Sequence, residues 1–354
     1  MKLKKLFAGV VAAAMIATMS FPAFAATNGK VHTLTNDKVE VDKVYKLEGV
    51  GDSPLETFGF KISALTGLNK NGAEKVTNVP VPTVGSADFS ETRATSAGTI
   101  KKVSVDFSNC NYTNVGTYYY KITENATTNA GVTISTPTQM RVTVVNDDEE
   151  NGGVTIASVT FWKQADSDMA DGEWKDKIDE AIAFENTYTA NSLTLKKTVR
   201  GNMGDKNNDK FTFKVTLTGE NGKTYADDYV VAGGSVNKTK AVRVDGNPYN
   251  ITIKHGEEIT IANLPAGIRY KVEEVASDGY TAYTSYGILD SERVTGTTVE
   301  GTTSAAAAEA AFTNVKDGTP DTGVILDNAP YMLMLAVVAG GAMTLVIKKR
   351  REEE

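Results

Sequence analysis

Two lysines lie at strand positions where the alternation of the sequence favours an apolar side chain. Lys43 follows Val41 by two residues, and Lys197 follows Leu195 in the same way. A lysine that faces the core loses solvation, which lowers the pKa of its ammonium group and makes the neutral amine accessible. Burial raises the pKa of a glutamic acid, so a Glu in the core stays protonated. Beside a buried Asn, the amine can attack the amide carbon while the acid polarises the carbonyl; ammonia then leaves, and a Lys–Asn isopeptide bond remains.

The sequence elements that would position such groups occur twice in the same order. Each copy has the lysine strand, a Phe-x-Phe-Lys strand, a Tyr-rich strand that ends in Glu, and a strand that contains Phe-x-Asn. In the first copy the last three read FGFKISALTG (58–67), YYYKITE (118–124) and AFENTY (183–188). In the second they read FTFKVTLTG (211–219), YKVEE (270–274) and AFTNVK (311–316). This repetition predicts two tandem domains of one kind, with a boundary near residues 187–191 that is too short for a flexible linker.

Alternation of apolar and polar residues dominates the chain between its two ends. The clearest alternating segments are residues 39–47, 58–62, 103–107, 142–144, 193–199 and 211–217. They are rich in Val, Ile, Thr, Tyr and Phe and are separated by turns that contain Gly, Asn and Asp, as half-buried antiparallel strands are. The sequence therefore predicts an all-β protein of two tandem immunoglobulin-like β-sandwiches.

Both ends of the chain carry targeting patterns. Residues 1–25 combine three early lysines, an apolar stretch and the small-x-small sequence Ala23-Phe24-Ala25, which predicts a cleaved secretory signal peptide. Residues 319–354 begin with Thr-Pro-Asp-Thr-Gly, continue with the apolar run 331–347, and reach a basic cluster at 348–351. An apolar run followed by basic residues predicts a membrane span with its basic end in the cytoplasm.

Composition excludes several classes of function. The 354 residues carry a formal charge of −7, with 37 basic and 44 acidic side chains, which argues against nucleic acid as a partner. Two histidines and one cysteine leave little for a metal site, exclude an intrachain disulfide and indicate no cofactor. A secreted β-sandwich enzyme would need a nucleophile and a base, and neither His32 nor His255 lies in a recognisable motif.

The two repeated units resemble the isopeptide-forming domains of Gram-positive pilins, which include the streptococcal-type pilin domain and the collagen-adhesin B-type sandwich. The resemblance covers nearly the whole chain between its targeting segments. Matched by motif, the crosslinking groups are Lys43, Glu124 and Asn186 in the first unit and Lys197, Glu274 and Asn314 in the second. Each glutamate would assist one bond, Lys43–Asn186 or Lys197–Asn314. Lys38, Lys46, Lys196 and Glu273 compete for these roles, but alternation favours the first set because its members share a face with apolar neighbours.

The C-terminal segment resembles the cell-wall sorting signal of Gram-positive surface proteins. That resemblance implies that a sortase cleaves between Thr322 and Gly323 and transfers the Thr carbonyl to an amine. The usual first residue of the signal is Leu, and Thr319 departs from it, which leaves the sortase class open. In related pilins the accepting lysine often precedes the crosslinking Asn, where this chain has Lys175 and Lys177, but no spacing selects either of them or excludes the other lysines of the chain.

The sequence thus predicts a signal peptide (1–25), a first sandwich (26–189), a second sandwich (190–318) and a sorting signal (319–354). The resemblance implies an exported pilus shaft subunit, held in the cell wall, whose partners are sortase, neighbouring pilin subunits and peptidoglycan. The only chemistry expected of the chain itself is single-turnover bond formation. The alternative is a wall-anchored monomeric adhesin that uses the same domains as a stalk. The sequence identifies no host ligand.

Overall fold

The computed structural model describes residues 33–69, 78–147, 153–163, 183–235 and 241–319. These residues form an all-β structure with one 3-10 turn, η1 (Asp290–Glu292). The first nine strands are β1 (Lys38–Gly49), β2 (Glu56–Phe58), β3 (Phe60–Asn69), β4 (Thr83–Val84), β5 (Ala87–Phe89), β6 (Thr99–Asp106), β7 (Gly116–Glu124), β8 (Thr138–Asn146) and β9 (Val154–Lys163). The remaining strands are β10 (Ala183–Arg200), β11 (Lys210–Thr218), β12 (Tyr229–Ala232), β13 (Ala241–Val242), β14 (Pro248–Lys254), β15 (Glu258–Pro265), β16 (Arg269–Glu274), β17 (Thr281–Ser285), β18 (Val294–Thr295), β19 (Thr298–Thr302) and β20 (Ala308–Val315).

The first unit has its core between two sheets. One sheet contains β10, β1, β6 and β4 in that order, and the other contains β3, β7, β8 and β9. Strand β1 alternates as the sequence predicts, with Val39, Val41, Lys43 and Tyr45 buried and the intervening residues at least partly exposed. Because successive side chains of a strand point to opposite faces, Lys43 has to enter the core together with its apolar neighbours.

The second unit repeats this plan with a separate core. The sheet of β14, β11, β16 and β19 lies across the core from a sheet that contains β10, β15, β12, β13, β20 and β17. Strand β11 buries Phe211, Phe213, Val215 and Leu217 on one face. The hydrophobic cluster of the second unit runs from Leu193 to Phe312 and contains no residue of the first cluster.

Strand β10 belongs to both units. It is 18 residues long, and its first half pairs with β1 while its second half pairs with β15 and β20. Ala190 is opposite Gly49 of β1 on one side and Pro265 of β15 on the other. The expected domain boundary at 187–191 therefore falls inside a continuous strand rather than in a loop.

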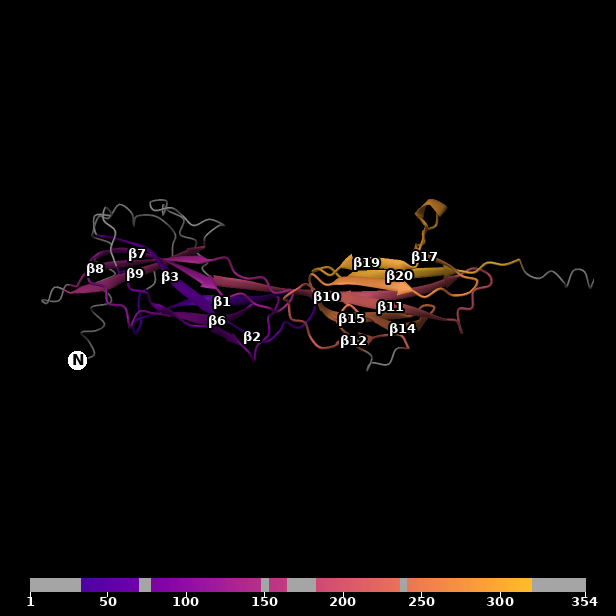
Figure 1. Ribbon diagram of the computed structural model, residues 1–354, viewed down its shortest axis with the longest axis horizontal. Coiled ribbons are helices and arrows are strands. Elements are labelled where there is room, and N and C mark those ends of the chain that lie inside the picture. The colour runs from indigo at the N-terminus through magenta and orange to yellow at the C-terminus, as the bar shows by residue number, and fades with distance from the viewer. Residues whose placement is uncertain (1–32, 70–77, 148–152, 164–182, 236–240, 320–354) are drawn as a thin grey trace, which may run out of the picture.

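Further contacts hold the two units end to end along the long axis of the molecule (Figure 1). The Oδ1 atom of Asn263 accepts a hydrogen bond of 2.9 Å from the backbone N–H of Asp52. Gly51 makes this approach possible, since a Cβ atom there would lie 2.2 Å from the same oxygen. Thr224 of the second unit donates its backbone N–H to the carbonyl of Thr128 at 2.7 Å. These polar contacts supplement β10 and oppose bending at the junction.

Within the described residues, no helix has the length and apolar character needed to cross a membrane. The apolar run 331–347 lies outside those residues.

Candidate functional sites in the two sandwiches

Each unit joins its first and last strands as a parallel pair, and the two pairs have the same register. In the first unit β1 pairs with β10, which places Lys43 opposite Phe184 and Tyr45 opposite Asn186. In the second unit β10 pairs with β20, which places Lys197 opposite Phe312 and Val199 opposite Asn314. In both units the asparagine is therefore two residues beyond the position opposite the lysine, on the same core-facing side.

The first centre brings Lys43, Glu124 and Asn186 together in the core. The Nζ atom of Lys43 lies 3.1 Å from each carboxylate oxygen of Glu124. Asn186 donates its Nδ2 to Oε1 of the same glutamate at 2.5 Å. Glu124 reaches the pair from β7, in the facing sheet, where it is opposite Phe60. A single carboxylate oxygen thus contacts both the amine and the amide nitrogen that would leave.

The second centre repeats this arrangement with Lys197, Glu274 and Asn314. Lys197 Nζ lies 2.7 Å from Glu274 Oε1, and Asn314 Nδ2 donates to the same oxygen at 2.5 Å. Glu274 comes from β16 and is opposite Phe213 of β11. The structure therefore brings together all six residues that the motifs matched, in two separate groups of three.

Burial makes both centres dry. Lys43, Asn186, Lys197 and Asn314 are each at most 1% exposed. Desolvation lowers the pKa of Lys197 to about 8, although the nearby Glu274 carboxylate opposes this shift. A buried ion pair loses the hydration of both charges, which favours proton transfer from the amine to the carboxylate. The environment therefore makes the neutral amine that amide formation requires more accessible than it is in water.

Aromatic rings form one wall of each centre. Lys43 Nζ lies 4.4 Å from the centroid of Phe58, and Lys197 Nζ lies 4.1 Å from that of Phe211. These are the first phenylalanines of the repeated Phe-x-Phe motif. The second phenylalanine of the motif packs against the last strand, as in the Phe213–Phe312 contact with a centroid distance of 5.0 Å. The motif excludes water and limits the positions that the lysine can adopt.

The two centres differ at the carbonyl oxygen of the asparagine. In the first, the backbone N–H of Ser135 donates to Asn186 Oδ1 at 2.9 Å and to Glu124 Oε2 at 3.1 Å. In the second, Asn314 Oδ1 and Glu274 Oε2 are buried without a hydrogen-bond partner among the described residues. A donor at this oxygen would stabilise negative charge that develops during attack. The sequence gives no signal for Ser135, because a backbone donor has no side-chain signature.

The competing residues lie at the surface in ion pairs. Lys46 pairs with Glu185 at 2.9 Å and Lys38 with Asp106 at 3.1 Å. Lys196 pairs with Glu309 at 2.9 Å, and Glu273 pairs with Lys271 at the same distance. None of these four lies in either centre. Thr322, Gly323, Lys175 and Lys177 are outside the described residues, so the structure gives no position for them.

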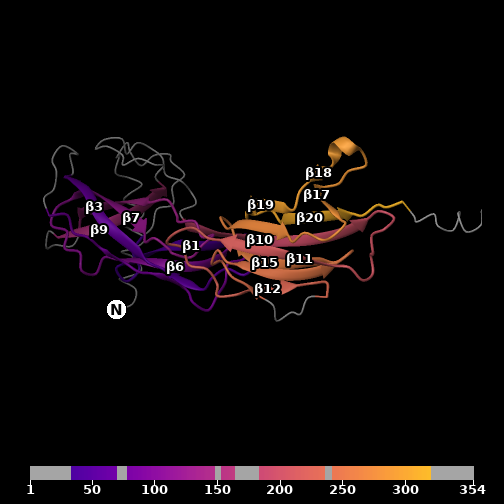
Figure 2. The ribbon, with the colours of Figure 1, turned by 45° about the vertical axis from the view of Figure 1, so that its right-hand side comes forward.

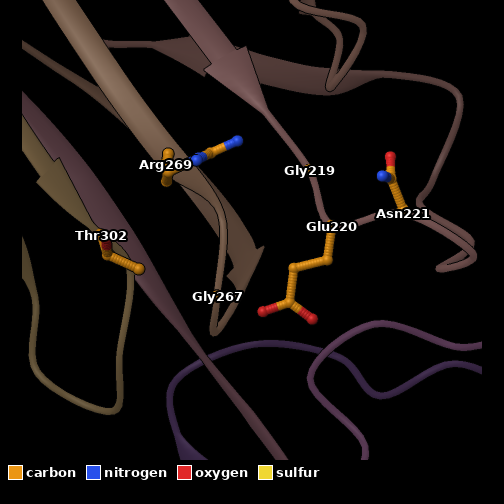
Figure 3. A pocket seen from close by; sticks show the side chains of 6 residues that line it. All are labelled: Gly219, Glu220, Asn221, Gly267, Arg269 and Thr302. Atoms are coloured by element: carbon orange, nitrogen blue, oxygen red, sulfur yellow. The ribbon is translucent and has the colours of Figure 1, made fainter.

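A separate hollow lies at the end of the second unit that faces the first (Figure 3). It is lined by Gly219, Glu220, Asn221, Gly267, Arg269 and Thr302. Figure 3 shows that the Glu220 carboxylate and the Arg269 guanidinium do not point toward each other. The lining residues include no histidine, cysteine or lysine, so the hollow resembles neither of the crosslinking centres.

Comparison with known proteins agrees with this geometry. Residues 39–189 match the family described as Spy0128-like isopeptide containing domain, and residues 191–316 match a domain of unknown function, DUF7601. A curated protein of Streptococcus pyogenes serotype M1 named "Pilin" is 30% identical over 351 residues, which cover 92% of this chain and 95% of that protein.

Two solved pilin structures are also similar. The crystal structure of the major pilin from Streptococcus pyogenes matches with 24% identity and a TM-score of 0.51, covering 80% of this chain and 100% of that one. The major pilin T3.2 of the same species matches with 26% identity and a TM-score of 0.49, covering 80% of this chain and 98% of that one.

The fold defines an all-β protein of two tandem sandwiches, each with a buried Lys–Glu–Asn centre, and the relatives identify the family. The chain belongs to the pilin family, and its first unit is a Spy0128-like isopeptide-containing domain. The expected resemblance to pilins is confirmed.

Proposed function

We propose that this pilin is a shaft subunit whose two sandwiches each form an autocatalytic Lys–Asn bond. The observation that carries this proposal is the duplicated centre, in which a buried lysine and a buried asparagine on paired first and last strands share one glutamate oxygen. Chance would not place the same three residue types in the same register twice. Each bond would connect the two ends of its domain covalently.

The reaction conserves protons within each centre. Glu274 takes a proton from the Lys197 ammonium, and the neutral Nζ attacks the Cγ atom of Asn314. A C–N bond forms, and the glutamate passes its proton to Nδ2 of Asn314, so that the old C–N bond breaks and ammonia leaves. The attacking Nζ loses its second proton to the same glutamate, which is protonated at the end of the reaction. The lysine amide then replaces a buried charged amine, which removes the desolvation penalty of the ammonium group. Lys43, Glu124 and Asn186 would react in the same way. The bond forms once, so the protein is not an enzyme with turnover.

We expect the rate of bond formation in the second unit to be constant up to about pH 8 and to fall above it. The reactive form keeps one proton on the Lys197–Glu274 pair, with the amine neutral and the acid protonated. Because the pKa of Lys197 is lowered to about 8, a higher pH removes this proton to solvent and leaves no acid for the departing nitrogen.

This pH profile can be measured by refolding. Chains with Lys43→Ala, in which only the second bond can form, are isolated unfolded and refolded between about pH 6 and pH 10, and the reaction is stopped at intervals for intact-mass measurement. A rate that keeps rising through pH 8 would show that the amine must lose its proton to water. Glutamate would then not be the proton acceptor.

Polymerisation is the second part of the proposal. A signal peptide at 1–25 would direct export, and the apolar tail would hold the precursor in the membrane until a sortase cleaves between Thr322 and Gly323. The Thr322 carbonyl would then join a lysine of the next subunit, for which Lys175 and Lys177 are the candidates, or the peptidoglycan cross-bridge. Support comes from the order of the C-terminal patterns and from membership of the pilin family.

Thr322→Ala should abolish the polymer. In cells that make the protein with its own sortase, wall extracts of the wild type should give a ladder of high-mass species on denaturing gels. The variant should give only the monomer, because the sortase would no longer recognise the residue whose carbonyl it transfers. Asp321→Ala, next to Thr322 but at the variable position of the Pro-x-Thr-Gly pattern, is the matched control. A ladder that survives Thr322→Ala would refute this joining site, and a single wild-type band would favour a monomeric stalk.

A further inference from the structure

A hairpin projects from the second unit beside the end where the chain leaves the fold (Figures 1 and 2). It consists of β17, β18 and the connecting turn η1. Its tip exposes three large apolar side chains: Ile288 is 93% exposed, Leu289 61% and Val294 56%. Single apolar residues on a surface are ordinary, but a cluster on a projecting element indicates a contact site.

Several contacts give the hairpin tip a defined conformation. Arg293 forms an ion pair with Asp290 at 2.6 Å and donates Nε to the carbonyl of Gly287 at 3.3 Å. The guanidinium of Arg293 lies 4.4 Å from the centroid of the Tyr286 ring, and that of Arg200 lies 5.2 Å from the same ring. These contacts attach the tip to the end of β10. The apolar residues are therefore presented by an ordered element.

The folded domain continues to the residue before the sorting pentapeptide. Asn202 donates Nδ2 to the carbonyl of Gly318 at 2.7 Å and accepts the N–H of Gly318 at 2.9 Å. The backbone N–H of Met203 donates to the carbonyl of Lys316 at 3.0 Å. Gly318 is thus fixed to the same end of the sandwich as the hairpin, since Arg200 is opposite Val315 in the β10–β20 pair.

The chain between Gly318 and the proposed junction is short. Thr322 follows Gly318 by four residues in the sequence, which span at most about 14 Å when fully extended. A subunit that is joined at Thr322 must therefore lie against the end of the second unit that carries the hairpin. Because every copy has a net negative charge, close contact between copies favours apolar surfaces over charged ones.

We infer that the hairpin tip, with Ile288 and Leu289 at its centre, docks on the next copy of this chain in the fibre. The inference rests on the proposed joining at Thr322 and deepens it. The covalent bond would hold two copies together, and the hairpin would fix their orientation beside that bond. The contact surface on the next copy belongs to its first unit, because the candidate acceptor lysines Lys175 and Lys177 precede Asn186 in that unit.

Photo-crosslinking in assembled fibres tests the contact directly. A photoreactive amino acid replaces Ile288, and fibres from the cell wall are irradiated, digested and analysed by mass spectrometry. Peptides that contain position 288 should be joined to peptides of a first unit. That first unit must belong to another copy, because the first unit of the same copy lies at the opposite end of the molecule (Figure 1). Val230 on β12, which is 54% exposed, is the matched control position and should give at least tenfold fewer such products. Equal yields at both positions, or products only with sortase or another protein, would overturn the inference.

Charged substitutions at the tip provide a second test. Ile288→Asp with Leu289→Asp should reduce the mean number of subunits per polymer several-fold, whereas Val230→Asp should leave it unchanged. Intact masses of the variants should still show both internal bonds, which would establish that they fold. A normal ladder from the double variant would overturn the docking site and leave Thr322 joining intact. If the wild type gives no ladder, or Thr322→Ala keeps one, the proposed function fails instead.

Discussion

Recombinant residues 26–322 should be lighter than their sequence mass by two molecules of ammonia, about 34 Da in total. Glu124→Ala and Glu274→Ala should each restore one ammonia, about 17 Da, after allowance for the substitution. The reason is that each glutamate oxygen contacts both reacting nitrogens of its own centre and no atom of the other centre. Without that oxygen the lysine has no partner to accept its proton and the asparagine nitrogen has no donor as it leaves.

Neighbouring residues provide matched controls for this measurement. Glu273→Ala removes a carboxylate one residue away from Glu274 that lies at the surface in a pair with Lys271, so the full deficit should remain. Lys197→Ala should also restore one ammonia, and Lys196→Ala is its control, because Lys196 lies at the surface in an ion pair with Glu309. A well-folded wild type with its full sequence mass would contradict both centres. A deficit that persists in Glu274→Ala would show that the second bond forms without this glutamate.

Alternation was sufficient to identify the lysines because burial in a strand has a period of two. Lys43 shares its face with Val41 and Tyr45, and no other lysine of β1 does. Glu274 differs from Glu273 in the same way, since only Glu274 shares a face with the buried Val272. Tyr270 is on that face as well, but it is only partly buried, packed at the margin of the second core. Side chains near the end of a sheet can lean outward without changing the alternation.

The continuity of β10 could not be inferred from the sequence. Residues 183–188 and 193–199 each have the pattern of a strand, and the polar Thr and Asn residues between them have the composition of a boundary. The intervening residues remain extended because they find partners on both sides: Ala190 pairs with Gly49 and Pro265. Such pairing depends on how the two units dock. Periodicity within one segment carries no information about docking, nor about the parallel pairing of first and last strands.

The shared strand gives the two proposed bonds a combined mechanical effect. Asn186 and Lys197 both belong to β10, so each bond ends on the same continuous strand. Tension that enters near Lys38 would pass along β1 to Lys43 and cross the first bond to Asn186. It would then follow β10 to Lys197, cross the second bond to Asn314 and leave the domain at Gly318. The rest of each sandwich is then outside the load path. Each bond also closes a loop of roughly 120–140 residues, which restricts the unfolded chain and contributes about 5 kcal/mol.

Pulling a single molecule between residue 33 and Gly318 should therefore give no unfolding step in the wild type. Asn314→Ala removes the second bond, so tension should unfold the second sandwich and release residues 198–313. The chain then lengthens by about 40 nm at ~3.6 Å per residue, less the folded length. Lys43→Ala should release residues 44–185 in the same way and lengthen the chain by about 50 nm. Both changes are large because a non-covalent sandwich resists tension only through hydrogen bonds and packing, whereas a crosslinked one must first break a covalent bond.

Asn250→Ala is the control for the pulling experiment, since Asn250 is exposed on β14 and contacts neither centre. It should behave as the wild type does. If the wild type extends by the same step as Asn314→Ala, the second bond does not carry the load. If the wild type extends only by the length of residues 44–185, the first bond is missing while the second is present. Because the two released lengths differ, one force–extension trace assigns the load to each bond separately and shows whether β10 transmits it between them.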